Sequence, residues 1–105
     1  MTDLRPDISP STVFALQTLD GGANTQTEAD AGIEADLDTQ YTIGVATGVP
    51  VTFISAGERN KDGLGGFLDM INFLLGESAP PQVLTTSYGQ NENTVSNNLA
   101  KSVAF

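Results

Sequence analysis

The apolar residues of this 105-residue chain fall into short segments whose spacing alternates between that of a strand and that of a helix. Three segments rich in β-branched and aromatic residues end near glycine and predict strands: 12–19, 49–55 and 83–88. Three segments with helical periodicity predict helices: 27–47, 64–75 and a last one that begins at Val95. This order predicts an α/β fold with a parallel sheet and right-handed crossovers, built from about three strands and three helices.

Length and the leading segment define the domain organisation. A chain of 105 residues is long enough for one small domain and too short for two, so we expect a single domain over residues 1–105. Pro6 and Pro10 predict an extended leading segment at 1–11, which the alternating part at 12–105 follows.

Charge and composition exclude several classes of function. Thirteen acidic against four basic residues give a net charge of −9, which repels phosphate groups, so neither nucleic acid nor a membrane is expected as a partner. The chain has no cysteine and no histidine, which excludes disulfides, thiolate chemistry and the usual general base of neutral pH. Any acid–base chemistry must therefore use carboxylates, which are well-matched bases in an acidic medium.

A pair of carboxylates lies in the first predicted helix. Glu34 and Asp38 are four residues apart, so they share one row of the helix, whereas Asp36 points to roughly the opposite side. Like charges at this spacing oppose helix formation by about 0.2–0.5 kcal/mol, so the pair requires an explanation. A neighbouring apolar row is expected to face a core and leave the pair partly desolvated; it consists of Ile33, Leu37 and Tyr41.

Other interpretations of these features are open. Acidic residues favour the first turns of helices, so Glu28, Asp30 and Glu34 can be structural only. The alternating elements also fit a nucleotide-binding or receiver-like domain. The glycine pair at 21–22, however, lacks the spacing that holds a pyrophosphate or triphosphate. No acid lies at the end of the strand at 49–55 to support the receiver interpretation.

Three motifs occur in order along the chain: 31–41, which contains Gly32-Ile33-Glu34-Ala35-Asp36-Leu37-Asp38, then 51–55, then 83–89, which ends in Ser87-Tyr88-Gly89. Together they resemble the sedolisin (serine-carboxyl peptidase) family, and most of all its secreted fungal tripeptidyl peptidases. The resemblance covers the chain from about Phe14 onward, and three ordered motifs are more specific than the acidic pair alone.

The resemblance implies a subtilisin-like parallel sheet with helices on both faces, and a peptidase that uses a Ser-Glu-Asp triad. By position, Glu34 is expected to be the general base and Asp38 the residue that orients it. Two stacked carboxyl groups that share a proton would confine the activity to acid. Ser87, Tyr88 and Gly89 match the edge segment along which family members bind a substrate peptide.

The chain departs from the family pattern in one important respect: no serine stands in the Ser-Gly-Thr-Ser-x-Ser setting of the family's nucleophile. The serines without that setting are Ser9, Ser11, Ser55, Ser78, Ser87, Ser96 and Ser102. The family's oxyanion-hole aspartate and calcium site are expected beyond Phe105. The chain is therefore expected to be an early part of a catalytic domain, without metal or other cofactor of its own.

For the full-length protein, the resemblance implies a calcium ion, a peptide or protein substrate, a monomeric form and an extracellular location, although no signal peptide is visible in the chain. The competing hypothesis is a non-catalytic acidic α/β interaction module from a truncated gene. The nucleotide sequence after Phe105 separates the two, because a peptidase gene would continue into the oxyanion and serine motifs and a finished module would meet a stop codon.

Overall fold

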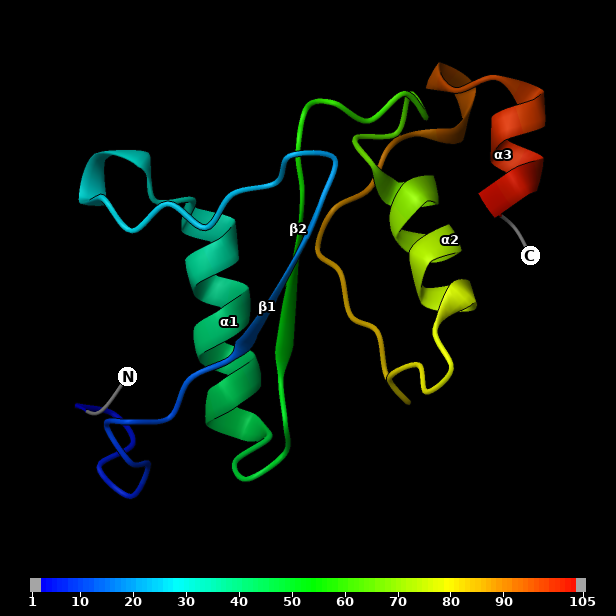
Figure 1. Ribbon diagram of the computed structural model, residues 1–105. Helices are drawn as coiled ribbons and strands as arrows, with labels where there is room; N and C mark the ends of the chain where they lie inside the picture. Colours follow the sequence, from blue (N-terminus) through cyan, green and yellow to red (C-terminus); the bar gives the residue numbers. More distant parts are fainter. Residues whose placement is uncertain (1–2, 104–105) are drawn as a thin grey trace. The chain divides into compact units, whose positions relative to one another are not determined.

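A computed structural model describes residues 3–103, which divide into two compact units (Figure 1). The first unit takes its described residues from 3–17 and 24–53, and the second from 18–23 and 54–103. The strands are β1 (Ala15–Leu19) and β2 (Thr52–Ala56), and the α-helices are α1 (Ile33–Val45), α2 (Phe67–Gly76) and α3 (Asn97–Val103). Two short 3-10 helices, η1 (Glu28–Asp30) and η2 (Glu92–Thr94), precede α1 and α3.

β1 and β2 form a parallel two-stranded sheet, which confirms the predicted α/β class. One backbone hydrogen bond lies at each end of this sheet. Near its start the Ala15 N–H donates to the Val51 carbonyl at 2.8 Å, and beyond its end the Gly57 N–H donates to the Leu19 carbonyl at 3.0 Å. Both strands begin in the first unit and end in the second. Each is shorter than predicted.

The predicted third strand, 83–88, is wrong. Residues 77–91 contain neither helix nor strand, and all residues from 83 to 88 are exposed. Val83 and Leu84 are 79% and 46% exposed, so their β-propensity is not matched by burial. A strand forms only where a neighbour pairs with it, and in the part of the chain that the structure describes the sheet consists of β1 and β2 alone.

The first predicted helix forms in two pieces. Its expected start at Thr27 yields only η1, where the Thr27 hydroxyl bonds to the Asp30 carboxylate at 2.6 Å instead of capping a backbone N–H. Gly32 is extended and separates η1 from α1. The capping-box spacing therefore marks a helical turn but misplaces the start of the α-helix.

The expectation that Ile33, Leu37 and Tyr41 face a core is wrong. They are 88%, 47% and 68% exposed, and Val45, one turn further, is 84% exposed. We call these four residues the apolar row of α1. The inward face of the helix instead carries Ala35 and Thr39, which are half-buried, and Ile43, which is buried.

The leading segment is folded into turns rather than extended. Its Ile8 is buried, and the Ile8 N–H donates to the Arg5 carbonyl at 3.1 Å. The Arg5 guanidinium donates to the Gly44 carbonyl near the end of α1 and forms an ion pair with Asp7 at 2.7 Å. The hydrogen bond from Arg5 lowers the pKa of Asp7 to about 2.

Aromatic packing also joins parts of the first unit. The Phe14 and Phe53 rings meet edge to face with their centroids 5.7 Å apart. In the second unit α2 packs against α3, and α2 covers most of the predicted helix 64–75 and ends at Gly76. Among residues 3–103 no helix has the length and apolar character needed to cross a membrane.

Candidate active site

Glu34 and Asp38 lie one turn apart near the start of α1. Both are half-buried, while Asp36, between them in the sequence, is exposed. The predicted asymmetry between the two sides of the helix is therefore present. The partly buried face of α1 that contains the pair continues through Thr39 to Ile43. The apolar row of α1 is not part of this face.

Local electrostatics favour a carboxylate at this end of α1. Glu34 and Asp36 occupy the first turn, where unpaired backbone N–H groups and the helix dipole favour negative charge. Gly32, the N-cap residue, offers no side chain to these N–H groups. The Asp38 carboxyl lies one turn further along the helix. Chemically, such a pair can accept a proton from a hydroxyl group and hold it.

A groove of about 410 Å³ lies beside this helix within the first unit. Its walls combine apolar side chains with amides and hydroxyls, and consist of Thr12, Val13, Phe14, Leu16, Asn24, Gln26, Thr39, Gln40 and Ile43. Glu34 and Asp38 are not among these lining residues. The groove therefore neighbours the pair on α1 without containing it.

Ser87, Tyr88 and Gly89 lie in the exposed irregular segment between α2 and η2. Tyr88 is 63% exposed, and its backbone N–H donates to the Thr86 hydroxyl at 3.3 Å. These residues belong to the second unit, whereas Glu34 and Asp38 belong to the first. Their proposed role in binding an extended peptide stays a prediction.

Asp62 has a clear structural role that sequence reasoning missed. Its Oδ1 accepts the N–H groups of Leu64 and Gly66 at 2.8 and 3.0 Å, and its Oδ2 accepts those of Leu68 and Asp69 at 2.8 and 3.4 Å. Gly66, the N-cap residue of α2, has a φ of +88° and no side chain, so Asp62 caps the helix from outside it. The sequence signal is an aspartate before a glycine-rich turn and an apolar helix.

Replacing Asp62 by asparagine should destabilise the start of α2 by about 1–2 kcal/mol. The amide group would turn N–H donors toward two of the backbone N–H groups that the carboxylate now binds. Hydrogen exchange of the α2 backbone should report the loss. Glu77→Gln, a neutralised exposed acid just after the other end of the same helix, is the control and should leave exchange nearly unchanged. Equal protection in Asp62→Asn and wild type would contradict this role.

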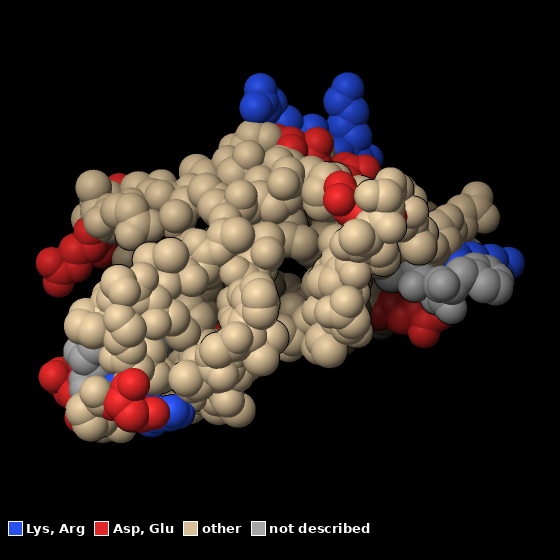
Figure 2. Space-filling model, turned by 60° about the horizontal axis from the view of Figure 1, so that its bottom comes forward, with Lys and Arg blue, Asp and Glu red and all other residues tan. Residues whose placement is uncertain are grey.

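Acidic side chains elsewhere show no sign of a metal centre. Within the described range 3–103, no group of three or more acidic side chains is placed to hold a metal ion. The calcium ion that the resemblance implies for the full-length protein is expected beyond Phe105 and stays a prediction. On the face shown in Figure 2, much of the surface carries neither acidic nor basic side chains.

Comparison with known proteins identifies several tripeptidyl-peptidases that are similar to this chain. The chain is 31% identical over 97 residues to a tripeptidyl-peptidase of Arthroderma otae, a match that covers 80% of this chain and 16% of that protein. It is 30% identical over 95 residues to a probable tripeptidyl-peptidase of Arthroderma benhamiae, covering 78% of this chain and 16% of that protein. It is 38% identical over 66 residues to human tripeptidyl-peptidase 1, covering 63% of this chain and 12% of that protein.

No family model matches the chain, and no solved structure does. The chain spans about 16% of the length of the fungal relatives named above. The predicted resemblance is nevertheless confirmed over about 80% of the chain. The chain is a homologue of one segment of the tripeptidyl-peptidases, and this is consistent with a fragment of a sedolisin-family protein.

Proposed function

We propose that this chain supplies the base and its orienting acid to a serine-type peptidase that acts in acid. The observation that carries the proposal is the half-buried pair Glu34 and Asp38, one helical turn apart in a chain homologous to tripeptidyl-peptidases. The absence of histidine supports it, because a carboxylate must then take the place of the usual base. The nucleophilic serine and the oxyanion donors come from the remainder of the peptidase.

In the proposed reaction, the Glu34 carboxylate accepts the proton of the serine hydroxyl as the serine oxygen bonds to the peptide carbonyl carbon. Glu34 then returns this proton to the leaving amine as the C–N bond breaks, and an acyl-enzyme remains. Water hydrolyses the acyl-enzyme by the same proton transfers. Asp38 orients Glu34 and shares its proton, and Ser87, Tyr88 and Gly89 bind the peptide backbone.

The proposed substrate is a peptide or protein, and release of tripeptides is the first activity to test, because the relatives bear the name tripeptidyl-peptidase. We place the proposed parent enzyme outside the cell, as the resemblance to secreted fungal tripeptidyl peptidases implies, where an acidic medium is compatible with its chemistry.

The 105-residue chain alone should release no tripeptides at acid pH, because a base without nucleophile and oxyanion hole stabilises no transition state. A chimera tests the positive half of the proposal. It carries residues of this chain in place of the matching segment of the Arthroderma otae tripeptidyl-peptidase. The chimera should cleave a fluorogenic tripeptide substrate in acid. A folded but inactive chimera, or activity of the isolated chain, would contradict the proposal.

A further inference from the structure

The turn after β1, the end of β2 and the start of α2 meet closely in the second unit. The Arg59 N–H donates to the Asp20 carbonyl at 3.2 Å, which ties the loop after β2 to the turn after β1. A Cβ placed on Gly66 would lie 2.7 Å from the Ala56 Cβ, so the start of α2 approaches the end of β2 with little free space. The side chains of this junction are therefore held near one another by the main chain.

One carboxylate oxygen of Asp20 lacks a hydrogen-bond donor at this junction, within the part of the chain that the structure describes. Its φ of +51° lies in the left-handed region, which aspartate and asparagine adopt more readily than most residues. Its Oδ2 is buried, and no donor among the described residues bonds to it. The Arg59 side chain does not supply one, because its Nε donates to the Asp20 backbone carbonyl at 3.4 Å. A buried carboxylate oxygen without a donor is unfavourable.

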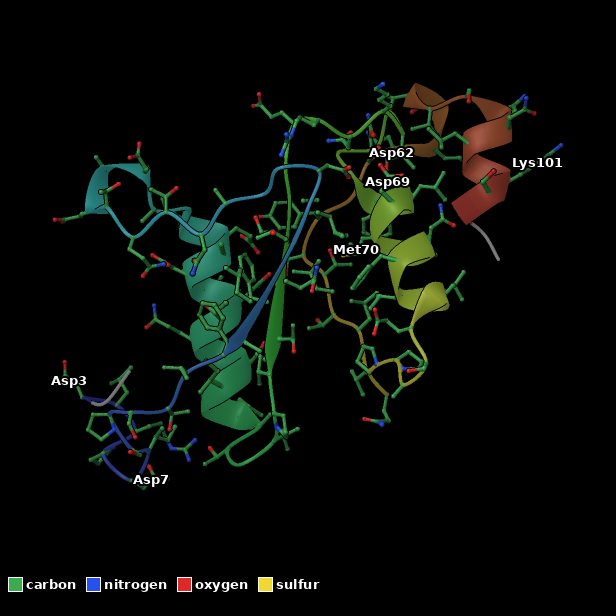
Figure 3. The ribbon with its side chains drawn as sticks, in the orientation of Figure 1. Asp3, Asp7, Asp62, Asp69, Met70 and Lys101 are labelled. Atoms are coloured by element: carbon green, nitrogen blue, oxygen red, sulfur yellow. The ribbon has the colours of Figure 1, made fainter. Side chains whose placement is uncertain are left out.

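The group that faces Asp20 is another carboxyl, that of Asp69 in the first turn of α2. Burial raises the pKa of Asp69, and the charges of Asp20 and Asp62 raise it further. The hydrogen bond that Asp69 can make to the Asp20 side chain once it is protonated acts in the same direction, against a smaller opposing effect of the Lys61 backbone N–H. Figure 3 shows Asp62 and Asp69 together at the start of α2, while Lys101 on α3 points away. Two carboxyl groups can hydrogen-bond to each other only when one of them is protonated.

We propose that Asp20 and Asp69 form a proton-dependent latch between the turn after β1 and the start of α2. In acid, one shared proton gives the buried Asp20 Oδ2 the donor it lacks and holds the two segments together. When both carboxyls are ionised, the hydrogen bond is lost and two negative charges face each other, so the start of α2 loosens. This device does not depend on peptidase activity.

Asp62 limits the stability of the start of α2 at low pH. Burial raises its pKa, but the four backbone N–H groups that it accepts outweigh burial, and its pKa is lowered from the ordinary value of 3.8. The Asp62 cap is therefore fully present above this value and is lost as the pH falls through the lowered pKa. The latch has the opposite sign: it is fully present below 3.8 and is lost as the pH rises through the raised pKa of Asp69. The two effects give the start of α2 its greatest stability in weak acid.

Hydrogen exchange of the full 105-residue chain measures how the stability of the start of α2 depends on pH, once the rates are corrected for the intrinsic pH dependence of exchange. Protection of the α2 amides should be greatest at about pH 4 and should fall about two- to fivefold toward pH 7. In Asp69→Asn the amide donates to Asp20 at every pH, so the fall above pH 4 should disappear. Asp20→Asn, which keeps a residue suited to the left-handed φ, should remove it too. Glu77→Gln should keep the wild-type profile.

A second measurement does not rely on any variant folding. Carbon-13 titration of the wild-type Asp69 carboxyl should show a pKa above the ordinary value of 3.8. The latch would be refuted if Asp69 titrated at or below that value. Persistence of the wild-type loss of protection in a folded Asp69→Asn protein would refute it equally.

Discussion

Replacing Glu34 by glutamine should lower the kcat of the active chimera by about 10²–10⁴-fold at its acid optimum. Glutamine keeps the size of the side chain and cannot accept the proton of a serine hydroxyl. KM for the peptide should change little, because the proposed base acts on the serine rather than holding the substrate. Initial rates over a range of tripeptide substrate concentrations separate the two parameters.

The matched control for this change is Asp36→Asn. Asp36 lies on the same helix and carries the same charge, but it is exposed and points away from the pair. Its kcat should stay within about threefold of the unsubstituted chimera, since a surface charge contributes little. If both variants lost activity alike, the loss would reflect the negative charge of α1, and the role of Glu34 as a base would be rejected.

Replacing Gly57 by alanine should destabilise the second unit by about 2–4 kcal/mol. The added Cβ would overlap the Gly21 carbonyl carbon and would lie 2.5 Å from the Gly22 nitrogen and 2.7 Å from the Asp20 carbonyl oxygen. All three are backbone atoms, so no side chain can rotate out of the way. The turn after β1 must move, and the hydrogen bond from the Gly57 N–H to the Leu19 carbonyl should break. Faster hydrogen exchange in α2 and a lower urea midpoint should report the change.

Gly76 offers a comparison within the same unit. A Cβ there meets no atom within 4 Å, and Gly76 is the last residue of α2. Gly76→Ala should therefore be neutral or slightly stabilising, by up to about 1 kcal/mol, because alanine loses less conformational freedom in a helix. Similar losses in both variants would show that the close approach at Gly57 does not control stability.

The sequence predicted those elements whose signal is local. The apolar periodicity of 64–75 located α2, and the β-branched run at 49–55 located β2, because each pattern is set by neighbours along the chain. The run at 83–88 is also rich in β-branched and aromatic residues, but it has no paired neighbour among the described residues, and composition cannot supply one. Strand formation depends on a partner that is distant in sequence.

For the candidate site, too, only the features set by local spacing were predictable. Spacing alone placed Glu34 and Asp38 on one row of α1, and their partial burial agrees with the prediction. The source of that burial was not predictable, because the segments that pack on α1 in the first unit are set by tertiary contacts such as Arg5 with the Gly44 carbonyl. The cap by Asp62 also escaped prediction, since it depends on left-handed glycines that bend the chain back onto one carboxylate.

The apolar row of α1 is exposed, which is unusual for a surface helix. Aliphatic and aromatic groups meet water on one side, whereas the pair of acids and Thr39 turn partly inward. Water around such a face is thermodynamically costly, and its release is driven mainly by entropy near room temperature. Any association that covers the row should therefore carry a negative change in heat capacity and become more favourable on mild warming.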